Sequence, residues 1–351
     1  MAGALDGITI IELAGIGPGP FAGMMLADHG ARVIRLVRPN QDSYSVFGKR
    51  DVLNRNREEI ELDLKAPESA VKFFELVRDS DGLMEGFRPG TLERLGIGPD
   101  VLLAENPRLV IGRMTGWGQE GPLASRAGHD INYIALSGAL HTYGRKGEKP
   151  TFPTNAVGDY GGGGMMLAFG MLAGILSARN TGKGQVVDCA MLDGAAAISA
   201  STYALLQTGL WEDERGVNLI DSGAPYYETY ETADGKYIAI GPLEDQFYGE
   251  LMDKLGLSDD AEFRDRDDRE KWPILKRRFE SLFLTRTRDE WCTLLEGTDC
   301  CFSPVLGLSE APSHPHNVAR HTFIEVNGVV QPAPAPRFSG TPAPPVRMPK
   351  H

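Results

Sequence analysis

Acid–base side chains stand in three short segments where loop is expected to turn into helix. The segments are 128–133 (GHDINY), 157–164 (VGDYGGGG) and 241–247 (GPLEDQF), and they contribute His129, Asp159 and Glu244. A histidine and a carboxylate supply two bases, and a second carboxylate can orient the histidine. The combination predicts an acid–base site.

Each of the three residues also has a purely structural alternative. His129 would then be a histidine satisfied by its surroundings, Asp159 a helix cap and Glu244 a solvated acid in a first helical turn. Two features favour a site. His129 stands immediately before an expected helix, for which Asp130 is a natural N-cap, and the glycines at 161–164 carry no side chains, so a ligand can approach the backbone there.

A glycine-rich loop at 15–20 (GIGPGP) lies between an expected strand at 7–13 and an expected helix at 21–29. A dinucleotide-binding loop would occupy this place. The spacing is not that of G-x-G-x-x-G, however, and Pro18 and Pro20 lack two of the backbone N–H groups that would face a pyrophosphate.

The second expected strand, 31–37, also ends wrongly for NAD. An acidic residue would meet the ribose there, but this strand is followed by Arg38. Arginine suits a phosphate, either the extra phosphate of NADP or the ribose phosphate of coenzyme A, with Arg55, Arg57 and Arg88 as further candidates. A surface arginine without a ligand is the alternative.

Composition describes an ordinary globular protein of 351 residues, 42% hydrophobic and 24% charged. The formal net charge of −12 argues against a nucleic acid or an anionic membrane as partner, because both require an excess of Lys and Arg. The longest uncharged stretch, 160–178, begins with glycines, and we interpret its second half as a buried helix.

The cysteines indicate a reduced, cytoplasmic protein. None of the four forms a C-x-x-C pair, and no signal peptide opens the chain, because 5–13 contains Asp6 and Glu12. The four are Cys189, Cys292, Cys300 and Cys301.

The order of the expected elements predicts an α/β fold. The strand–helix–strand opening implies a Rossmann-like parallel sheet covered by helices, and this sheet would form a large lobe. Further strands are expected at 82–85, 109–113 and 185–190, with helices at 69–80, 130–140 and 164–179. The last of these helices should stop at the NTGKG segment, 180–184.

A smaller α+β domain is expected from about residue 225. Strands at 226–232 and 236–240 flank an Asp-Gly turn, and helices should follow at 246–255, at 272–284 and from Thr287. The expected division is a large domain at 1–190, a linker helix region at 191–224, a small domain at 225–310 and a segment at 311–351 that returns to the large domain. Its end, 331–351, is rich in Pro and Ala and should wrap over a surface as an extended tail.

The chain resembles the α-methylacyl-CoA racemases of the family III CoA-transferase superfamily. The similarity is collinear over residues 5–343 and is strongest in the segments ELAGIGPGPFAGMMLADHGARV, LMEGFRPGTLERLGIGP, RMTGWGQEGP, AGHDINYIALSG, NAVGDYGGGG, TGKGQVVD, LIDSGAPYYETY, EDQFY and SPVLGLSEAPSHPHN. One departure stands out. The family usually has IEPQFY where this chain has Leu243-Glu244-Asp245-Gln246-Phe247-Tyr248, so a proline is lost and a charge is gained.

The resemblance implies roles for individual residues. His129 and Asp159 would be the two catalytic bases, and Glu244 would orient the histidine. An enolate formed beside the thioester needs its oxygen stabilised, and the backbone N–H of Asp130 is the best-placed donor.

The resemblance also implies how coenzyme A is held and how subunits associate. Arg38 and Arg88 would hold phosphates, the backbone at 62–64 (Leu62, Asp63 and Leu64) would line the adenine site, and the rest of the GHDINY motif would contact the substrate through Gly128, Ile131, Asn132 and Tyr133. Coenzyme A is part of the substrate, and no metal or other cofactor is expected. An interlocked homodimer is expected, in which Glu244 reaches His129 of a partner chain.

The predicted activity is interconversion of (2R)- and (2S)-2-methylacyl-CoA thioesters by 1,1-proton transfer. The first alternative is a CoA-transferase of the same superfamily, in which Asp159 attacks the thioester and forms a mixed anhydride. The second is a non-catalytic acyl-CoA carrier or an NADP-binding module.

Overall fold

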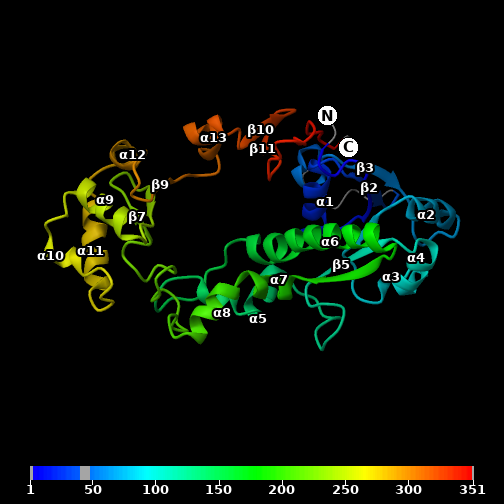
Figure 1. Cartoon of the computed structure of the whole chain (residues 1–351), viewed down its shortest axis with the longest axis horizontal. Helices are drawn as coiled ribbons and strands as arrows, with labels where there is room; N and C mark the ends of the chain where they lie inside the picture. The colour runs from blue at the N-terminus through cyan, green and yellow to red at the C-terminus, as the bar shows by residue number, and fades with distance from the viewer. Residues whose placement is uncertain (1–2, 40–47, 350–351) are drawn as a thin grey trace. The chain divides into compact units, whose positions relative to one another are not determined.

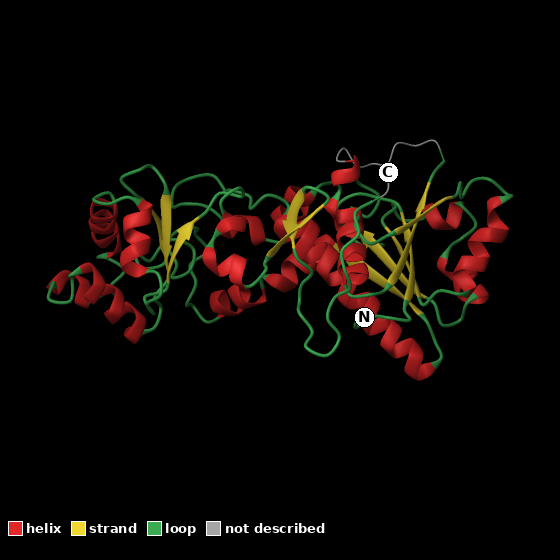
Figure 2. Cartoon of the chain, turned by 90° about the horizontal axis from the view of Figure 1, so that it is seen from above, coloured by secondary structure: helices red, strands yellow, loops and turns green. Residues whose placement is uncertain are grey.

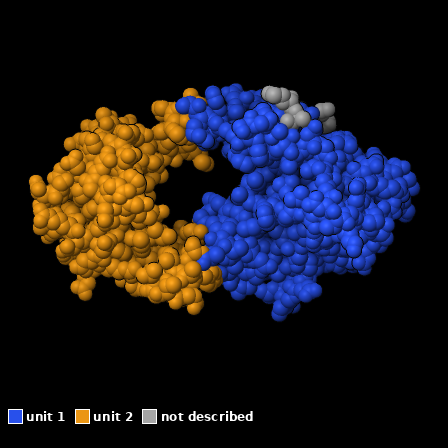
Figure 3. Space-filling model, in the orientation of Figure 1, with its two compact units in different colours: residues 1–139, 153–200, 319–351 blue, residues 140–152, 201–318 orange. Residues whose placement is uncertain are grey.

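The chain folds into two compact units in the computed structural model, which describes residues 3–39 and 48–349. The large unit comprises residues 1–139, 153–200 and 319–351, and the small unit comprises 140–152 and 201–318 (Figure 3).

The large unit is built on a six-stranded parallel sheet in the order β3-β2-β1-β4-β5-β6. This is the doubly wound order, so the expected α/β fold with a Rossmann-like sheet is confirmed. Strands β2, β3 and β5 of the sheet are labelled in Figure 1. Strands such as TIIEL and RVIRLV are buried on both faces, and their charged side chains Glu12 and Arg35 are buried with them, 4.0 Å apart. The strands are β1 (Thr9–Leu13), β2 (Arg32–Val37), β3 (Glu58–Glu61), β4 (Gly82–Glu85), β5 (Val110–Thr115) and β6 (Gln185–Ala190).

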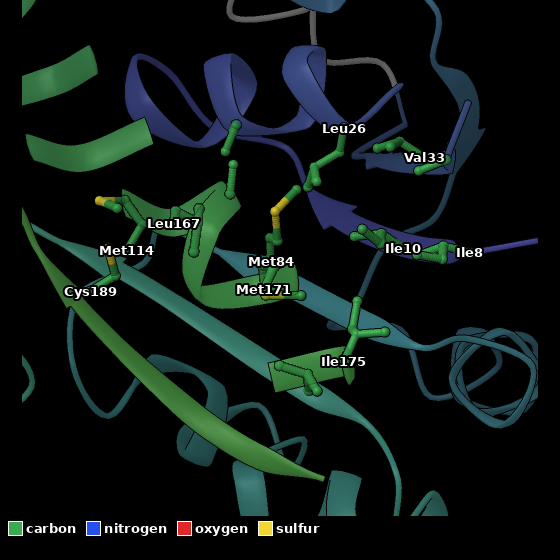
Figure 4. Close-up of a cluster of buried hydrophobic side chains, with 14 of the residues drawn as sticks. Ile8, Ile10, Leu26, Val33, Met84, Met114, Leu167, Met171, Ile175 and Cys189 are labelled. Atoms are coloured by element: carbon green, nitrogen blue, oxygen red, sulfur yellow. The ribbon is translucent and has the colours of Figure 1, made fainter. Parts of the chain in front are cut away.

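Helices pack on the two faces of this sheet. On one face, α1 (Pro18–Asp28) and α6 (Met166–Thr181) bury a cluster that includes Leu26, Leu167 and Met171 against Ile10 and Val33 (Figure 4). The opposite face is covered by α2 (Ser69–Arg78), α3 (Thr91–Arg94) and α4 (Pro99–Glu105). The large unit also contains α5 (Asp130–Leu136), α7 (Met191–Ile198), and the antiparallel pair β10 (Phe323–Val326) and β11 (Val329–Pro332).

The small unit joins a three-stranded antiparallel sheet to several helices. The expected hairpin is confirmed as β7 (Glu228–Glu231) and β8 (Tyr237–Ile240), and β9 (Phe302–Val305) pairs with β8. Its core is aromatic, with rings of Tyr230, Phe279, Phe283 and Trp291 in contact. Its helices, drawn in red in Figure 2, are α8 (Ala200–Gln207), α9 (Asp245–Leu255), α10 (Ala261–Arg264), α11 (Trp272–Phe283), α12 (Arg288–Leu295) and α13 (Pro315–Ala319).

Three expected helices have different bounds. The first begins at Pro18, because proline is favoured in a first turn, rather than at residue 21. The helix expected at 130–140 ends at Leu136, because Gly138 takes a positive φ of 83°. The helix expected from 164 is preceded by a π-helix, Ala156–Met165, that contains the glycine run.

The two units divide the chain at other points than the four expected segments. Residues 140–152 belong to the small unit, where Arg145 binds Glu228 and Arg215 donates to the carbonyl oxygens of His141 and Glu148. The chain passes into the small unit after residue 200 and leaves it after residue 318. Residues 350 and 351 of the expected tail lie outside the described residues.

One helical stretch, Ala156–Thr181, is long and apolar enough to cross a membrane by length and composition. Half of its most apolar window is buried, and Leu167, Met171 and Ile175 belong to the core of the large unit (Figure 4). These contacts are those of a core helix.

Candidate active site

Asp159 lies beside the loop that follows β1, at the carboxyl end of that strand. A Cβ atom placed on Gly17 would be 3.4 Å from its Oδ2 atom. The order of the sheet reverses between β1 and β4, and open α/β sheets bind ligands at the carboxyl ends of strands at such a switch point. Asp159 is therefore where this fold places a ligand.

Two hydrogen bonds hold Asp159 in the π-helix. The side-chain amide of Asn155, one turn earlier, donates to Oδ2 of Asp159 at 3.0 Å. The backbone N–H of Asp159 donates to Oδ1 of Asp130 at 2.7 Å. Since Asp130 is the first residue of α5, this second bond joins the GHDINY motif to the aspartate motif 29 positions later.

The pKa of the Asp159 carboxyl is raised above its ordinary value. Burial is the largest cause, and the negative charge of Asp130 acts in the same direction. The hydrogen bond from Asn155 and the charge of a protonated His129 lower it. His129 and Asp159 are thus close enough to interact electrostatically, and Asp159 is a stronger base than an exposed carboxylate.

His129 stands at the N-cap of α5 with its side chain exposed. Its backbone N–H donates to Oδ1 of Asn132 at 3.0 Å, which fixes the turn that carries the imidazole. Tyr133 anchors the same helix, because its buried ring packs edge-to-face on Trp117. Burial and the charges of Asp159 and Asp130 raise the pKa of Tyr133.

The glycine run at 161–164 packs against neighbouring parts of the large unit. A Cβ on Gly162 would lie 2.6 Å from the backbone nitrogen of Ala195 in α7. A Cβ on Gly164 would lie 2.7 Å from the ring of Phe21 in α1. These glycines let α1 and α7 approach the π-helix closely, which shapes the site from behind.

Glu244, in the small unit, is the N-cap of α9, and its side chain is exposed. Arg266 holds the loop before it, donating to the carbonyl oxygens of Pro242 and Leu243 and pairing with Asp245 at 2.6 Å. The same guanidinium lies over the rings of Tyr226 and Tyr248. Asp245, the residue that departs from the family pattern, thus becomes part of a clamp on this loop.

Two of the four candidate phosphate arginines are available to a ligand. Arg38, directly after β2, and Arg88, after β4, are both exposed. Both follow carboxyl ends of strands of the large unit. The N–H of Leu62 donates to the carbonyl oxygen of Val37, which brings the segment 62–64 beside Arg38.

The suggestion that Arg55 and Arg57 join the phosphate cluster is wrong. Arg55 is buried and pairs with Asp28 at 2.5 Å, while its other nitrogen donates to Gln331. Arg57 is buried against Glu12 at 3.0 Å and donates to backbone carbonyl oxygens. Their charges are already matched by the protein.

Sequence reasoning missed two groups that the structure adds to the site. Asn155 binds Asp159, and its position four residues earlier, one helical turn away, is the only signal the sequence offers. The carboxylate of Asp130 was expected to cap α5, but the N-cap is His129, and this carboxylate instead accepts the backbone N–H of Asp159.

Among residues 3–39 and 48–349, no group of three or more His, Cys, Asp or Glu side chains is arranged to hold a metal ion. All four cysteines are free thiols.

The doubly wound sheet with an acid–base cluster at its switch point belongs to an established class, and the chain is a member of CoA-transferase family III, whose family model matches residues 5–350. It is 45% identical over 341 residues to the α-methylacyl-CoA racemase of Homo sapiens, covering 97% of this chain and 88% of that one. The racemase of Mus musculus is 42% identical over 342 residues, covering 97% and 88%. A CAIB/BAIF family protein from Brucella suis, 26% identical, superposes with a TM-score of 0.84 over 100% of this chain and 97% of that one. The resemblance expected from the motifs is confirmed.

Proposed function

We propose that this protein interconverts (2R)- and (2S)-2-methylacyl-CoA thioesters by 1,1-proton transfer. The likeness to two α-methylacyl-CoA racemases supports the reaction class. The observation that carries the mechanism is the 2.7 Å hydrogen bond from the backbone N–H of Asp159 to Asp130, because it joins the segment that carries His129 to a carboxyl whose pKa is raised by burial.

Racemisation uses one base on each face of a planar enolate. With one enantiomer, Asp159 removes the α-proton and protonated His129 returns a proton to the other face. With the opposite enantiomer, neutral His129 is the base and protonated Asp159 is the acid. A carboxyl with a raised pKa suits both roles, since it is more basic when ionised and more easily found protonated.

The enolate oxygen needs a fixed donor, and the N–H of Asp130 supplies it. Asp130 is the first residue of α5, where backbone N–H groups have no acceptor within the helix. Because α5 has only seven residues, this single donor matters more than the dipole of the helix.

Coenzyme A lies along the carboxyl edge of the sheet in this proposal. Arg38 and Arg88 hold its phosphates, Leu62, Asp63 and Leu64 line the adenine, and Gly128, Ile131 and Asn132 contact the thioester end. Tyr133 is buried against Trp117 and supports this motif by packing. Coenzyme A belongs to the substrate, and the mechanism uses no metal or other cofactor.

An interlocked homodimer completes the site in this proposal, with Glu244 orienting His129 of a partner chain. Support comes from the exposed position of Glu244 at the start of α9 and from the exposed apolar stripe of Met165, Phe169 and Leu176 on the large unit. We also propose a cytoplasmic location, from the free thiols and the acidic composition.

The decisive experiment incubates (2R)-2-methylacyl-CoA with enzyme in heavy water without an acceptor acid. We expect deuterium at the α-carbon together with loss of chirality, and near-complete loss of racemisation in Asp159→Asn and His129→Gln. Full racemisation by either variant would refute the two-base assignment.

The competing function is CoA transfer with Asp159 as nucleophile, which the family's name favours. Three results together would establish it. CoA transfer would depend on an added carboxylic acid, hydroxylamine would trap the mixed anhydride on Asp159, and no deuterium would enter the α-carbon. A shift of the melting temperature by NADP and not by acyl-CoA would favour a nicotinamide-binding module.

A further inference from the structure

The carboxylate of Asp130 is buried at the centre of the site. Its residue is 7% exposed, and its Oδ1 atom accepts the backbone N–H of Asp159 at 2.7 Å. It therefore fixes the main chain at the residue that carries the proposed base, within a π-helix, a conformation that is rare and often found at functional sites.

Gly158 makes this contact possible. A Cβ atom on Gly158 would lie 2.4 Å from Oδ1 of Asp130 and 2.9 Å from its Cγ. Any side chain at 158 would therefore push the carboxylate away. Glycine at position 158 thus allows the hydrogen bond between Asp130 and the backbone of Asp159.

Burial of the second oxygen of this carboxylate lowers the stability of the fold, so stability cannot be the reason for the charge. Oδ2 of Asp130 is buried and has no hydrogen-bond partner within the part of the chain that the structure describes. An asparagine could accept the same N–H from Asp159 through its own oxygen, without burying a charge. The negative charge itself thus points to a function.

The charged and titratable groups around Asp159 come mainly from one helix. Asp130, His129 and Tyr133 of α5 interact with it, and Asn155 of its own helix donates to it. Gly17, directly before α1, lies so near that a Cβ on it would be 3.4 Å from Oδ2 of Asp159, and α7 packs on the π-helix through Gly194 and Ala195.

We propose that Asp130 is a positioning residue whose carboxylate both fixes the backbone of Asp159 and holds a negative charge beside it, so that Asp159 is a strong enough base for the α-carbon. This inference rests on the proposed function and deepens it. The charge of Asp130 raises the pKa of Asp159, and the hydrogen bond keeps its carboxyl aimed at the substrate.

The test compares Asp130→Asn with Asp130→Ala. Asp130→Asn keeps the hydrogen bond and removes the charge, so the acid limb of the exchange rate should move to lower pH, by roughly half a unit or more, with a plateau lowered about 3- to 10-fold. Asp130→Ala loses both contributions, and its plateau should fall by about 100-fold. Gly158→Ala should resemble Asp130→Ala.

Measuring the same pH profile in a protein that also carries His129→Gln shows whether the acid limb of the exchange rate belongs to Asp159. Without the histidine, Asp159 alone should exchange the α-proton of one enantiomer with retention of configuration. The acid limb of this exchange should move to lower pH when Asp130→Asn is added. Asp193→Asn, an exposed aspartate on α7, is the matched control and should leave the limb in place.

An unmoved acid limb in Asp130→Asn, with the Asp159→Asn variant inactive, would overturn this inference alone. An active Asp159→Asn variant would instead overturn the proposed function. A merely structural role would lower the melting temperature of Asp130→Asn without moving the limb, and that result also contradicts the proposal. If Asp130→Ala does not fold, the proposal is tested by the pH of the acid limb of the exchange rate in Asp130→Asn alone.

Discussion

At the scale of residues, the raised pKa of Asp159 links catalysis to stability. A carboxyl that is more easily protonated in the folded state than in the unfolded state lowers stability as the pH rises above its ordinary value of 3.8. The cost is fully present above the raised pKa and disappears below 3.8. At neutral pH, the ionised carboxylate of Asp159 therefore lowers the stability of the folded protein.

We therefore expect Asp159→Asn to be inactive but at least as stable as the parent protein at pH 7. The gain should shrink as the pH is lowered from the raised folded-state pKa toward 3.8, because the parent carboxyl then becomes protonated in the folded state. Thermal unfolding of both proteins from pH 4 to 8 measures this. A variant less stable than the parent at pH 7, or a pH-independent gain, would contradict it.

Residue types and spacing indicate His129, Asp159 and the backbone of Asp130 because acid–base side chains beside glycines are rare and local. The fates of Arg55 and Arg57 could not be predicted in this way. Asp28 and Gln331, which bind Arg55, are 27 and 276 positions away, and only the folded chain brings them together. Whether an arginine is free for a phosphate depends on such distant partners.

At the scale of elements, close helix packing depends on glycines that face each other. A Cβ on Gly194 of α7 would lie 1.9 Å from the carbonyl oxygen of Gly162 in the π-helix. Neither helix can move away without disturbing Asp159, which lies on the same turn as Gly162.

Gly194→Ala should therefore lower the free energy of unfolding by about 3 kcal/mol or more and reduce exchange activity. Gly19→Ala in α1 is the matched control, because a Cβ there meets nothing within 4 Å. It should be neutral or slightly stabilising, since alanine is the better helix former. Urea denaturation followed by circular dichroism compares them, and equal stabilities would refute the packing argument.

The strands were predictable from sequence because parallel strands buried on both faces read as short apolar runs bounded by turn residues. The expected strand 82–85 matches β4, and 185–190 matches β6. The π-helix was not predictable, because glycine disfavours an α-helix without indicating what replaces it. The π-helical conformation depends on contacts with α1 and α7, which the local sequence does not reveal.

At the scale of the whole molecule, α6 and the last residue of the π-helix before it show an apolar stripe that the large unit itself leaves uncovered. Met165, Phe169 and Leu176 are 52%, 71% and 63% exposed, while Leu167, Met171 and Ile175 on the other side of the helix are buried. In the proposed dimer, a second copy covers this stripe.

Phe169→Glu should convert the dimer into a monomer, because a carboxylate would have to be buried at the contact. Racemisation should fall with it if Glu244 acts on a partner's His129. Leu308→Glu is the control, since Leu308 is 97% exposed in the small unit. Sedimentation velocity measures the result, and a Phe169→Glu protein that remains dimeric would contradict this surface as the interface.

The large unit is assembled from both ends of the chain. Gln331 accepts from Arg55, the carbonyl oxygen of Ala335 meets His29 at 3.0 Å, and Asn56 exchanges hydrogen bonds with Arg347. A ribosome translating this message therefore adds every residue of the small unit before it adds 319–349. A chain that ends at residue 318, once released from the ribosome, would contain all of the small unit. Its large unit would still lack residues 319–349, which bind Arg55, His29 and Asn56.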